Sequence, residues 1–341
     1  MKKLFAILFA VILSTSVYAQ RSNAFSDATY NTIADDSYYL FNLIDWNKLE
    51  FDKAFIGAST IYNNFLQLYS AFHIGQNTLM VGLEGNLWAD NALNRSYFLF
   101  GHKNFSVYAN YEQLKNGKWE IFETEYYGKM YCPTIGFGYN IDEKNAISTT
   151  VNYNYIDGTD IDVHYTRVNA TYKKNLVLSK TKNSSFQLKY DTSYLNGNNN
   201  VTNEKTNYFI HCITPTYKLE TKLNEKLDFG FLVYVPFGYI KKTSKTCLFI
   251  DPITINNGFS YQFTQNLLGN IGISIKTPSI NFPKEGDVYT GIFYSRYSLG
   301  LTFMPSSNIK IDGSCYFTPS AGLSLNDIQS YELALSVSAK F

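Results

Sequence analysis

The sequence predicts an all-β chain that closes into a transmembrane antiparallel β-barrel of about 16 strands, with 14 as the alternative. Apolar and polar side chains alternate with a period of two through most of residues 51–341, as they do in strands with two unlike faces. Short polar turns, centred near residues 103, 143, 182, 223, 265 and 306, recur about every forty residues, which is the length of two strands and a longer loop. Beyond residue 20 no apolar run is long enough for a membrane helix.

Residues 1–19 are expected to be a cleaved secretory signal peptide. Lys2 and Lys3 precede an apolar run from Leu4 to Leu13, which is too short to span a bilayer, and compact residues follow up to Ala19. The alternatives are an N-terminal anchor and a buried strand. Export by a short basic signal indicates a bacterial envelope protein.

Residues 51–341 are expected to form the barrel, because closing the sheet removes edges whose unpaired backbone groups are costly in lipid. A soluble secreted β-sandwich is the alternative. Most prolines are expected in connections, including the long loops 196–206, 237–252, 277–288 and 318–329, and Pro133 and Pro215 are expected at bulges. The expected strands are 54–62, 65–74, 78–88, 95–101, 105–112, 123–139, 147–156, 162–178, 186–195, 207–219, 227–236, 253–263, 267–276, 289–303, 308–317 and 330–341.

The inward faces of these strands carry both charge signs together with apolar and aromatic residues. The lumen-facing candidates are Met80, Glu84, Lys189, Asp191, Tyr234, Tyr294 and Arg296. Mixed charges predict no strong ion selectivity. The apolar share suits a hydrophobic or amphipathic solute, or packing against the residues before the barrel.

The last strand alternates strictly and ends on an aromatic side chain. Its apolar positions are Tyr331, Leu333, Leu335, Val337 and Phe341. This pattern resembles the C-terminal signature of outer-membrane barrels, which the barrel-assembly machinery recognises. The resemblance implies the bacterial outer membrane as location, with the assembly machinery and outer-membrane lipids as partners.

Residues 20–50 do not alternate. Ala34-Asp35-Asp36, followed by aromatic Phe41 and by Asn42, resembles the N-terminal motif of FadL-like long-chain fatty acid transporters and their PorV-like relatives. Asn42 is followed by Leu43-Ile44-Asp45 where those proteins carry Pro-Ala-Gly. The resemblance implies that residues 20–50 fold into the lumen as a plug. A disordered periplasmic leader is the alternative, which the aromatic content of the segment disfavours.

The function expected from this resemblance is passive uptake of small hydrophobic or amphipathic solutes. A general diffusion porin and a PorV-like scaffold or surface interaction protein are the alternatives. No enzyme, cofactor or metal is expected, because His73, His102, His164 and His211 lack metal-ligand spacing and no hydrolase motif is present. The 29 basic and 28 acidic residues nearly cancel, so nothing favours nucleic acid.

Overall fold

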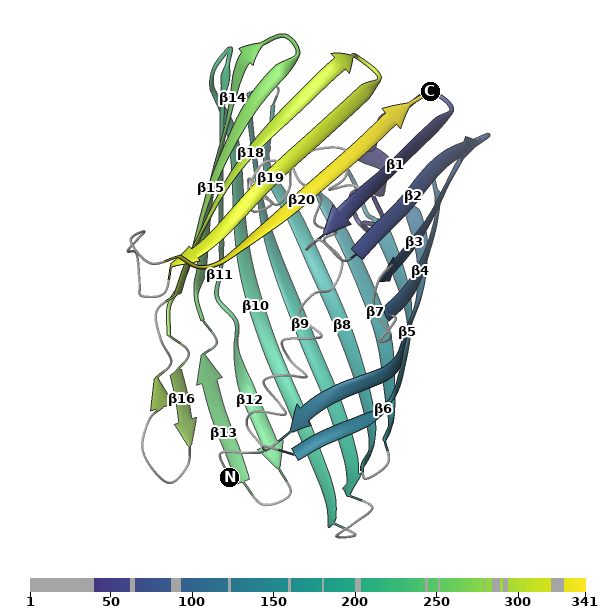
Figure 1. Cartoon of the computed structure of the whole chain (residues 1–341), viewed down its shortest axis with the longest axis vertical. Helices are drawn as coiled ribbons and strands as arrows, with labels where there is room; N and C mark the ends of the chain where they lie inside the picture. Colours follow the sequence, from purple (N-terminus) through teal and green to yellow (C-terminus); the bar gives the residue numbers. More distant parts are fainter. Residues whose placement is uncertain are drawn as a thin grey trace.

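The computed structural model describes residues 40–61, 65–86, 93–121, 124–158, 161–179, 181–199, 204–242, 245–250, 252–278, 280–283, 289–290, 294–319 and 328–341. The described part of the chain forms one antiparallel sheet of twenty strands (Figure 1). The sheet closes because β1 pairs with β2 on one side and with β20 on the other. The barrel therefore has no free strand edge at this seam, which lipid would not tolerate.

The first ten strands are β1 (Ala54–Ile61), β2 (Phe65–Ile74), β3 (Asn77–Asn86), β4 (Leu93–His102), β5 (Phe105–Ile121), β6 (Thr124–Asn140), β7 (Asn145–Gly158), β8 (Ile161–Leu178), β9 (Lys182–Asn199) and β10 (Glu204–Asn224). The remaining ten are β11 (Leu227–Tyr234), β12 (Phe237–Lys242), β13 (Lys245–Ile250), β14 (Thr254–Thr264), β15 (Leu267–Lys276), β16 (Ile280–Pro283), β17 (Tyr289–Thr290), β18 (Tyr294–Ser306), β19 (Ile309–Pro319) and β20 (Ile328–Lys340).

Four of these strands continue another one across a short break, so the wall has sixteen positions. β11 and β12 both pair with β10, and β13 and β16 continue the ladder of β14 and β15. β17 likewise precedes β18 after a short gap. The predicted closed antiparallel barrel of 16 strands is confirmed.

Three prolines interrupt neighbouring strands at one level of the wall. Pro236, Pro252 and Pro278 fall between the paired stretches of β11 and β12, of β13 and β14, and of β15 and β16. A proline has no N–H to give to the ladder, so pairing stops at this proline line and resumes beyond it. The prediction of long loops at 237–252 and 277–288 was therefore wrong, because β12, β13 and β16 lie within those ranges.

Pro133 and Pro215 were predicted to lie at bulges, and this prediction was wrong. Pro133 pairs with Tyr111 and Pro215 pairs with Leu188, and neither ladder changes register at these residues. The proline is accommodated by a missing ladder bond instead of an inserted residue: the β6–β7 pairing skips residues 132 and 133 and continues in the same register.

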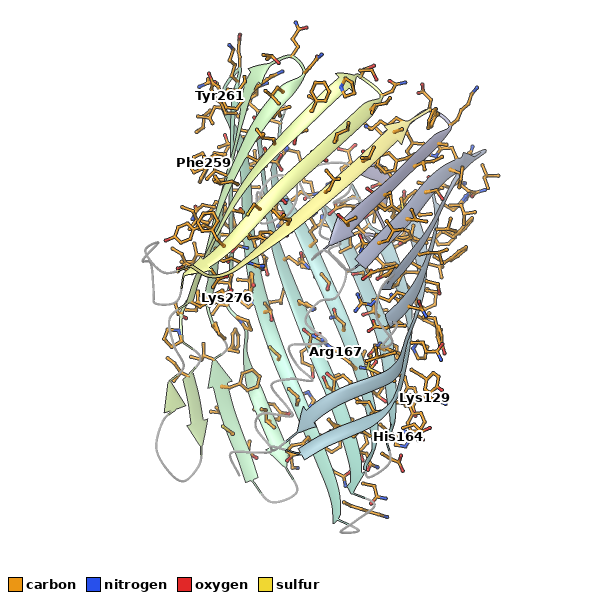
Figure 2. All side chains as sticks on the ribbon, in the orientation of Figure 1. Lys129, His164, Arg167, Phe259, Tyr261 and Lys276 are labelled. Atoms are coloured by element: carbon orange, nitrogen blue, oxygen red, sulfur yellow. The ribbon has the colours of Figure 1, made fainter. Side chains whose placement is uncertain are left out.

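The two faces of the wall differ in polarity. Outward side chains are large, apolar and about half exposed, as at Leu83, Leu299 and Leu335. Phe259 and Tyr261 likewise point away from the barrel on β14 (Figure 2). Inward positions of the same strands carry small polar residues that are almost completely buried, such as Ser298 and Thr302. This arrangement suits a wall surrounded by acyl chains.

No helix in the described residues is long and apolar enough to cross a membrane.

Candidate functional site: the lumen and residues 40–51

Residues 40–51 pack against the inner face of β1 to β5, near the rim where the short turns lie. Leu40, Phe41, Trp46 and Leu49 are buried. They share one hydrophobic cluster with inward side chains of the wall, which are Phe55, Tyr69, Ala71, Met80, Leu99 and Tyr108. Within the cluster, the only regular element of the segment is a single 3-10 turn, η1 (Trp46–Lys48). The segment is thus held by contacts with the wall more than by its own hydrogen bonds.

Glycines in the wall make room for this segment. A Cβ atom at Gly101 would lie 2.5 Å from the Trp46 ring, and one at Gly138 would lie 2.0 Å from the carbonyl oxygen of Leu43. Both separations are far below van der Waals contact. Ser106 also donates a hydrogen bond of 2.7 Å to the Leu43 carbonyl. The wall therefore has space for the Leu43 carbonyl and the Trp46 ring where it carries glycine.

Two residues predicted from the sequence are found here: Met80 contacts the segment, and Asn42 is part of it. The Phe41 N–H points to the Met80 sulfur at 3.3 Å, and Met80 is fully buried. The Asn42 side-chain oxygen accepts hydrogen bonds from the backbone N–H groups of Ile44 and Asp45 at 3.0 and 3.1 Å. Phe41 itself has a φ of 54°, a left-handed conformation that is strained for a non-glycine residue. Ala34, Asp35 and Asp36 lie outside the described residues, as does the expected signal peptide.

An ion cluster fixes the same segment electrostatically. The Asp45 carboxylate contacts the ammonium groups of Lys173 on β8 and of Lys48, the latter at 2.9 Å. Burial opposes ionisation of Asp45, but the two cations outweigh it and lower the pKa of this carboxyl to about 2. The carboxylate is therefore ionised and paired under ordinary conditions.

A second polar network crosses five neighbouring strands on the inner face. Arg95 lies between Glu84 and Glu112 and contacts each carboxylate at 2.8 Å. Gln67 donates to Glu84 at 2.9 Å, and Ser59 donates to Gln67 at 3.0 Å. Glu84 was among the sequence candidates, but Arg95 and Glu112 were not. The alternation of β4 and β5 could have placed both on the inward face, because each is directly opposite its partner in the register.

A third network surrounds Asp191 on β9. Arg167 contacts this carboxylate at 2.8 Å, Asn169 donates to it at 2.6 Å, and Lys189 lies 3.4 Å away. Asp191 and Lys189 therefore share one cluster with Arg167, a residue not predicted from the sequence. Because charges of both signs are paired in these networks, they exert little net field on the lumen.

The inner face beyond these networks, toward the long-loop rim, is apolar. Its buried residues are Val163, Tyr165, Leu195, Tyr208, Ile210 and Phe249, with Ile156, Cys212 and Ile240 packed beside them. They come from β7, β8, β9, β10, β12 and β13, and register pairs such as Leu195–Tyr208 and Ile210–Ile240 place them side by side. We call this set the apolar mouth patch. None of its members was predicted from the sequence as a lumen residue, because the patch forms only when side chains from six strands lie at one level of the wall.

The remaining candidates lie on β11 and β18. Arg296 stacks over the Tyr316 ring at 4.3 Å, and the Tyr294 hydroxyl lies 3.2 Å from the Thr318 hydroxyl. Tyr234 is half-buried and pairs with Thr254 across the ladder.

Nearby, three buried polar atoms on one inner row have no hydrogen-bond partner among the described residues. They are Ser260 Oγ, Asn270 Oδ1 and Ser314 Oγ. Gly300 separates Asn270 from Ser314 in this row, so no side chain stands between them.

The final strand presents its apolar residues outward. Leu333, Leu335, Val337 and Phe341 are 48%, 51%, 41% and 60% exposed, which fits contact with lipid. Tyr331 lies on the same strand. The backbone of Phe341 pairs with Ala54 and so completes the seam between the last and first strands.

Among the described residues, no group of three His, Cys, Asp or Glu side chains is arranged to hold a metal ion.

The comparisons with known proteins bear on the fold. No protein-family model matches the chain. No curated protein sequence matches it either. Among solved structures, the chain is similar to the P. putida toluene transporter TodX, with 9% identity, 94% of this chain and 99% of that chain covered, and a TM-score of 0.47. It is also similar to the CymD monoaromatic hydrocarbon channel, with 7% identity, coverages of 94% and 97%, and a TM-score of 0.49.

A third similar structure is CdiB from Escherichia coli, with 7% identity, coverages of 86% of this chain and 64% of that chain, and a TM-score of 0.56. At such low identity the likeness supports the barrel fold alone. A closed antiparallel barrel with an apolar outer face spans a lipid bilayer, and barrels of this kind belong to the bacterial outer membrane.

Proposed function

We propose that this barrel is a passive channel for small hydrophobic or amphipathic solutes, with residues 40–51 as part of a plug on the short-turn side. The observation that carries the proposal is the apolar mouth patch, since a water-filled porin would line this part of its lumen with polar and charged groups. A hydrophobic solute gains free energy on entering such a lining from water.

Two further observations support this proposal. The charged groups of the three networks are paired with one another, so an ion gains little by approaching them. The resemblance of residues 34–42 to FadL-like transporters points in the same direction, and the names of TodX and CymD describe transport of hydrocarbons by those proteins.

The test is solute uptake by intact cells whose lipopolysaccharide layer slows hydrophobic compounds. We expect expression of the chain to increase the initial uptake rate of a labelled alkylphenol several-fold, and expect the variant Ile210→Asn, which places an amide in the mouth patch, to remove most of that increase. Thr150→Asn, an inward polar-to-polar change outside the patch, is the matched control and retains the increase.

Liposome swelling with sugars provides the second arm. Rapid swelling with a disaccharide would show an open general porin and contradict the proposal. An uptake increase that Ile210→Asn leaves intact, in a variant that still folds, would also contradict it. Folding of each variant is checked by the shift in electrophoretic mobility between unheated and boiled samples.

A further inference from the structure

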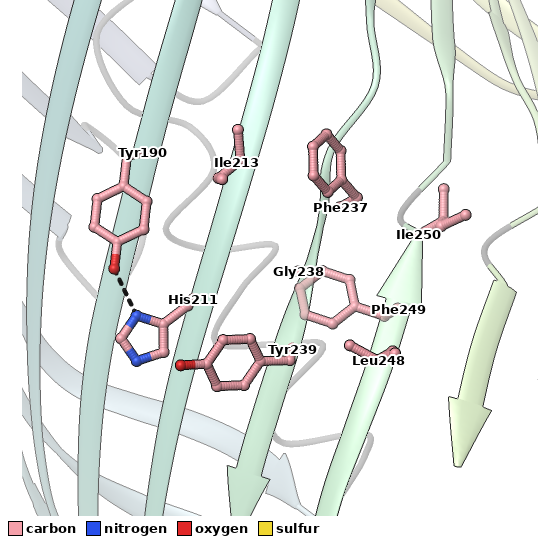
Figure 3. A pocket seen from close by; sticks show the side chains of 9 residues that line it. All are labelled: Tyr190, His211, Ile213, Phe237, Gly238, Tyr239, Leu248, Phe249 and Ile250. Atoms are coloured by element: carbon pink, nitrogen blue, oxygen red, sulfur yellow. Dashed lines mark hydrogen bonds between the residues drawn. The ribbon is translucent and has the colours of Figure 1, made fainter. Parts of the chain in front are cut away.

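An apolar groove of about 540 Å³ lies on the outer face of the barrel, where β9, β10, β12 and β13 meet (Figure 3). Its walls include Tyr190, His211, Ile213, Phe237, Tyr239 and Leu248. Leu248 is 58% exposed and Phe237 is 42% exposed, so the groove opens away from the lumen. It opens on the opposite face from the apolar mouth patch, most of whose residues occupy the alternate, inward positions of the same strands, and Phe249 alone borders both.

The groove follows from the break in the wall at the proline line. Phe237 and Ile250 are the first paired residues beyond Pro236 and Pro252, and both line the groove. Gly238 forms its floor: a Cβ atom there would lie 1.9 Å from the His211 carbonyl oxygen, so β12 comes closer to β10 than a side chain would allow. The depression is thus built into the backbone and does not depend on one side-chain rotamer.

The groove ends at the long-loop edge of the lipid-facing band, which is the lower edge in Figure 1. Outward positions of β10 are apolar from Leu219 to Phe209 except for His211, and the next outward residues, Asn207 and Lys205, are polar and exposed. A band of this length matches the roughly ten residues that a tilted strand needs to cross the hydrocarbon layer. Phe209 therefore marks the level where hydrocarbon gives way to lipid headgroups.

One lysine lies at that level, and two polar groups lie just inside it along the groove. The Tyr190 hydroxyl lies 2.7 Å from His211 Nδ1, and the His211 ring stacks on Tyr239 at 4.7 Å (Figure 3). Tyr190 thus fixes the imidazole at its Nδ1 edge. Lys241 is exposed, lies two residues beyond Tyr239 on the same outward face of β12, and is in register with Phe209. Phosphate groups of lipids occupy this depth, and an ammonium and an imidazole N–H are their usual protein partners.

We propose that this groove is a binding site for one anionic phospholipid of the surrounding membrane. One acyl chain fills the apolar groove between Ile213, Phe237 and Leu248, and the phosphate contacts His211 and Lys241. The groove is continuous with the lipid-facing band and therefore favours an acyl chain, and the ammonium group of Lys241 at its rim favours an anionic headgroup. The site is independent of the proposed transport function, since it faces away from the lumen.

Native mass spectrometry of the purified full-length barrel tests the site. The protein is released from neutral detergent micelles that contain equal amounts of dioleoylphosphatidylglycerol and dioleoylphosphatidylcholine, which carry the same acyl chains. We expect one retained lipid per barrel, with phosphatidylglycerol preferred about fivefold, the effect of roughly one cation beside an anionic headgroup. Lys241→Gln combined with His211→Gln removes this preference. Leu248→Trp, which fills the groove, removes retention of both lipids.

Matched controls separate the site from general effects. Lys226→Gln neutralises a lysine in an exposed short turn, and Ile135→Trp adds the same bulk to an outward position of β6 that is 54% exposed. Neither control changes the retained lipid. Equal retention of the two lipids by the unmodified barrel would overturn the proposal, as would a Leu248→Trp variant that still folds and still retains one lipid.

Discussion

Asp45 and Lys173, which are 128 residues apart in the chain, form a buried ion pair inside the barrel. The pair links residues 40–51 to the inner face of β8, four strands beyond the glycine at position 101 that receives Trp46. It is a long-range constraint on where the segment lies. Such a pair contributes little net stability when intact, but removing one partner leaves a buried charge behind.

Replacing Lys173 by methionine is therefore expected to release residues 40–51 from the wall. The loss is about 3 kcal/mol of docking free energy, the low end for a buried pair, because Lys48 still contacts Asp45. Single-channel conductance in planar bilayers should rise several-fold. Lys174→Met is the matched control, since this neighbouring side chain is exposed on the other face of β8. Equal conductance of the two variants would contradict the prediction.

The same pair predicts how docking of the segment depends on pH. The folded-state pKa of Asp45 is about 2, below its ordinary value of 3.8, because Lys173 and Lys48 outweigh the effect of burial. Stability from a lowered carboxyl pKa is fully present above the ordinary value and is lost as the pH falls through the folded value. We expect conductance to be constant from pH 7 to pH 5 and to rise between about pH 4 and pH 2. Asp45→Asn should remove this rise.

The sequence predicted the barrel because alternation is a local signal. Each strand shows its two faces within about ten residues, and the seam from Phe341 to Ala54 follows once the strands are counted. The same signal was visible at Phe237-Gly238-Tyr239-Ile240, but Pro236 and Pro252 beside it indicated a loop. A single sequence does not reveal that three prolines fall opposite one another, so that strands resume beyond them.

The lumen was less predictable because its contacts join distant positions. Alternation places Met80 and Glu84 on the inward face, but nothing near Glu84 in the sequence marks Arg95 as its partner. The contact between Leu43 and Gly138 is similar. A glycine inside a strand normally weakens the strand, and only the position of residues 40–51 in the structure shows that a side chain at 138 would collide with the Leu43 carbonyl. The apolar mouth patch needed six strands in register before it formed a surface.

Gly138→Ala is expected to displace residues 40–51 without unfolding the barrel. The added methyl group would lie 2.0 Å from the Leu43 carbonyl oxygen, and a backbone atom cannot yield as a flexible side chain does. Protease cleavage within residues 40–51 should become several-fold faster. The control is Gly313→Ala, where a Cβ atom meets nothing within 4 Å. A Gly138→Ala variant as resistant as this control would show that the segment does not occupy the notch.

Arg95→Gln is expected to be the most destabilising single change in the lumen. It leaves the carboxylates of Glu84 and Glu112 on either side of position 95 without the cation between them, and the side chain of Glu84 is only 5% exposed. Unpaired buried charge of this kind costs about 3 to 5 kcal/mol. Urea unfolding of the barrel in micelles, followed by tryptophan fluorescence, measures the loss.

Glu112→Gln supplies the comparison, because Arg95 keeps its 2.8 Å contact with Glu84 and the replaced side chain is the more exposed partner at 17%. This variant should lose less than half as much stability. Adding Glu84→Gln and Glu112→Gln to Arg95→Gln should recover most of the loss, since the remaining amides can hydrogen bond to one another without charge repulsion. If the triple variant is as unstable as Arg95→Gln alone, packing of the arginine and not its charge stabilises this wall.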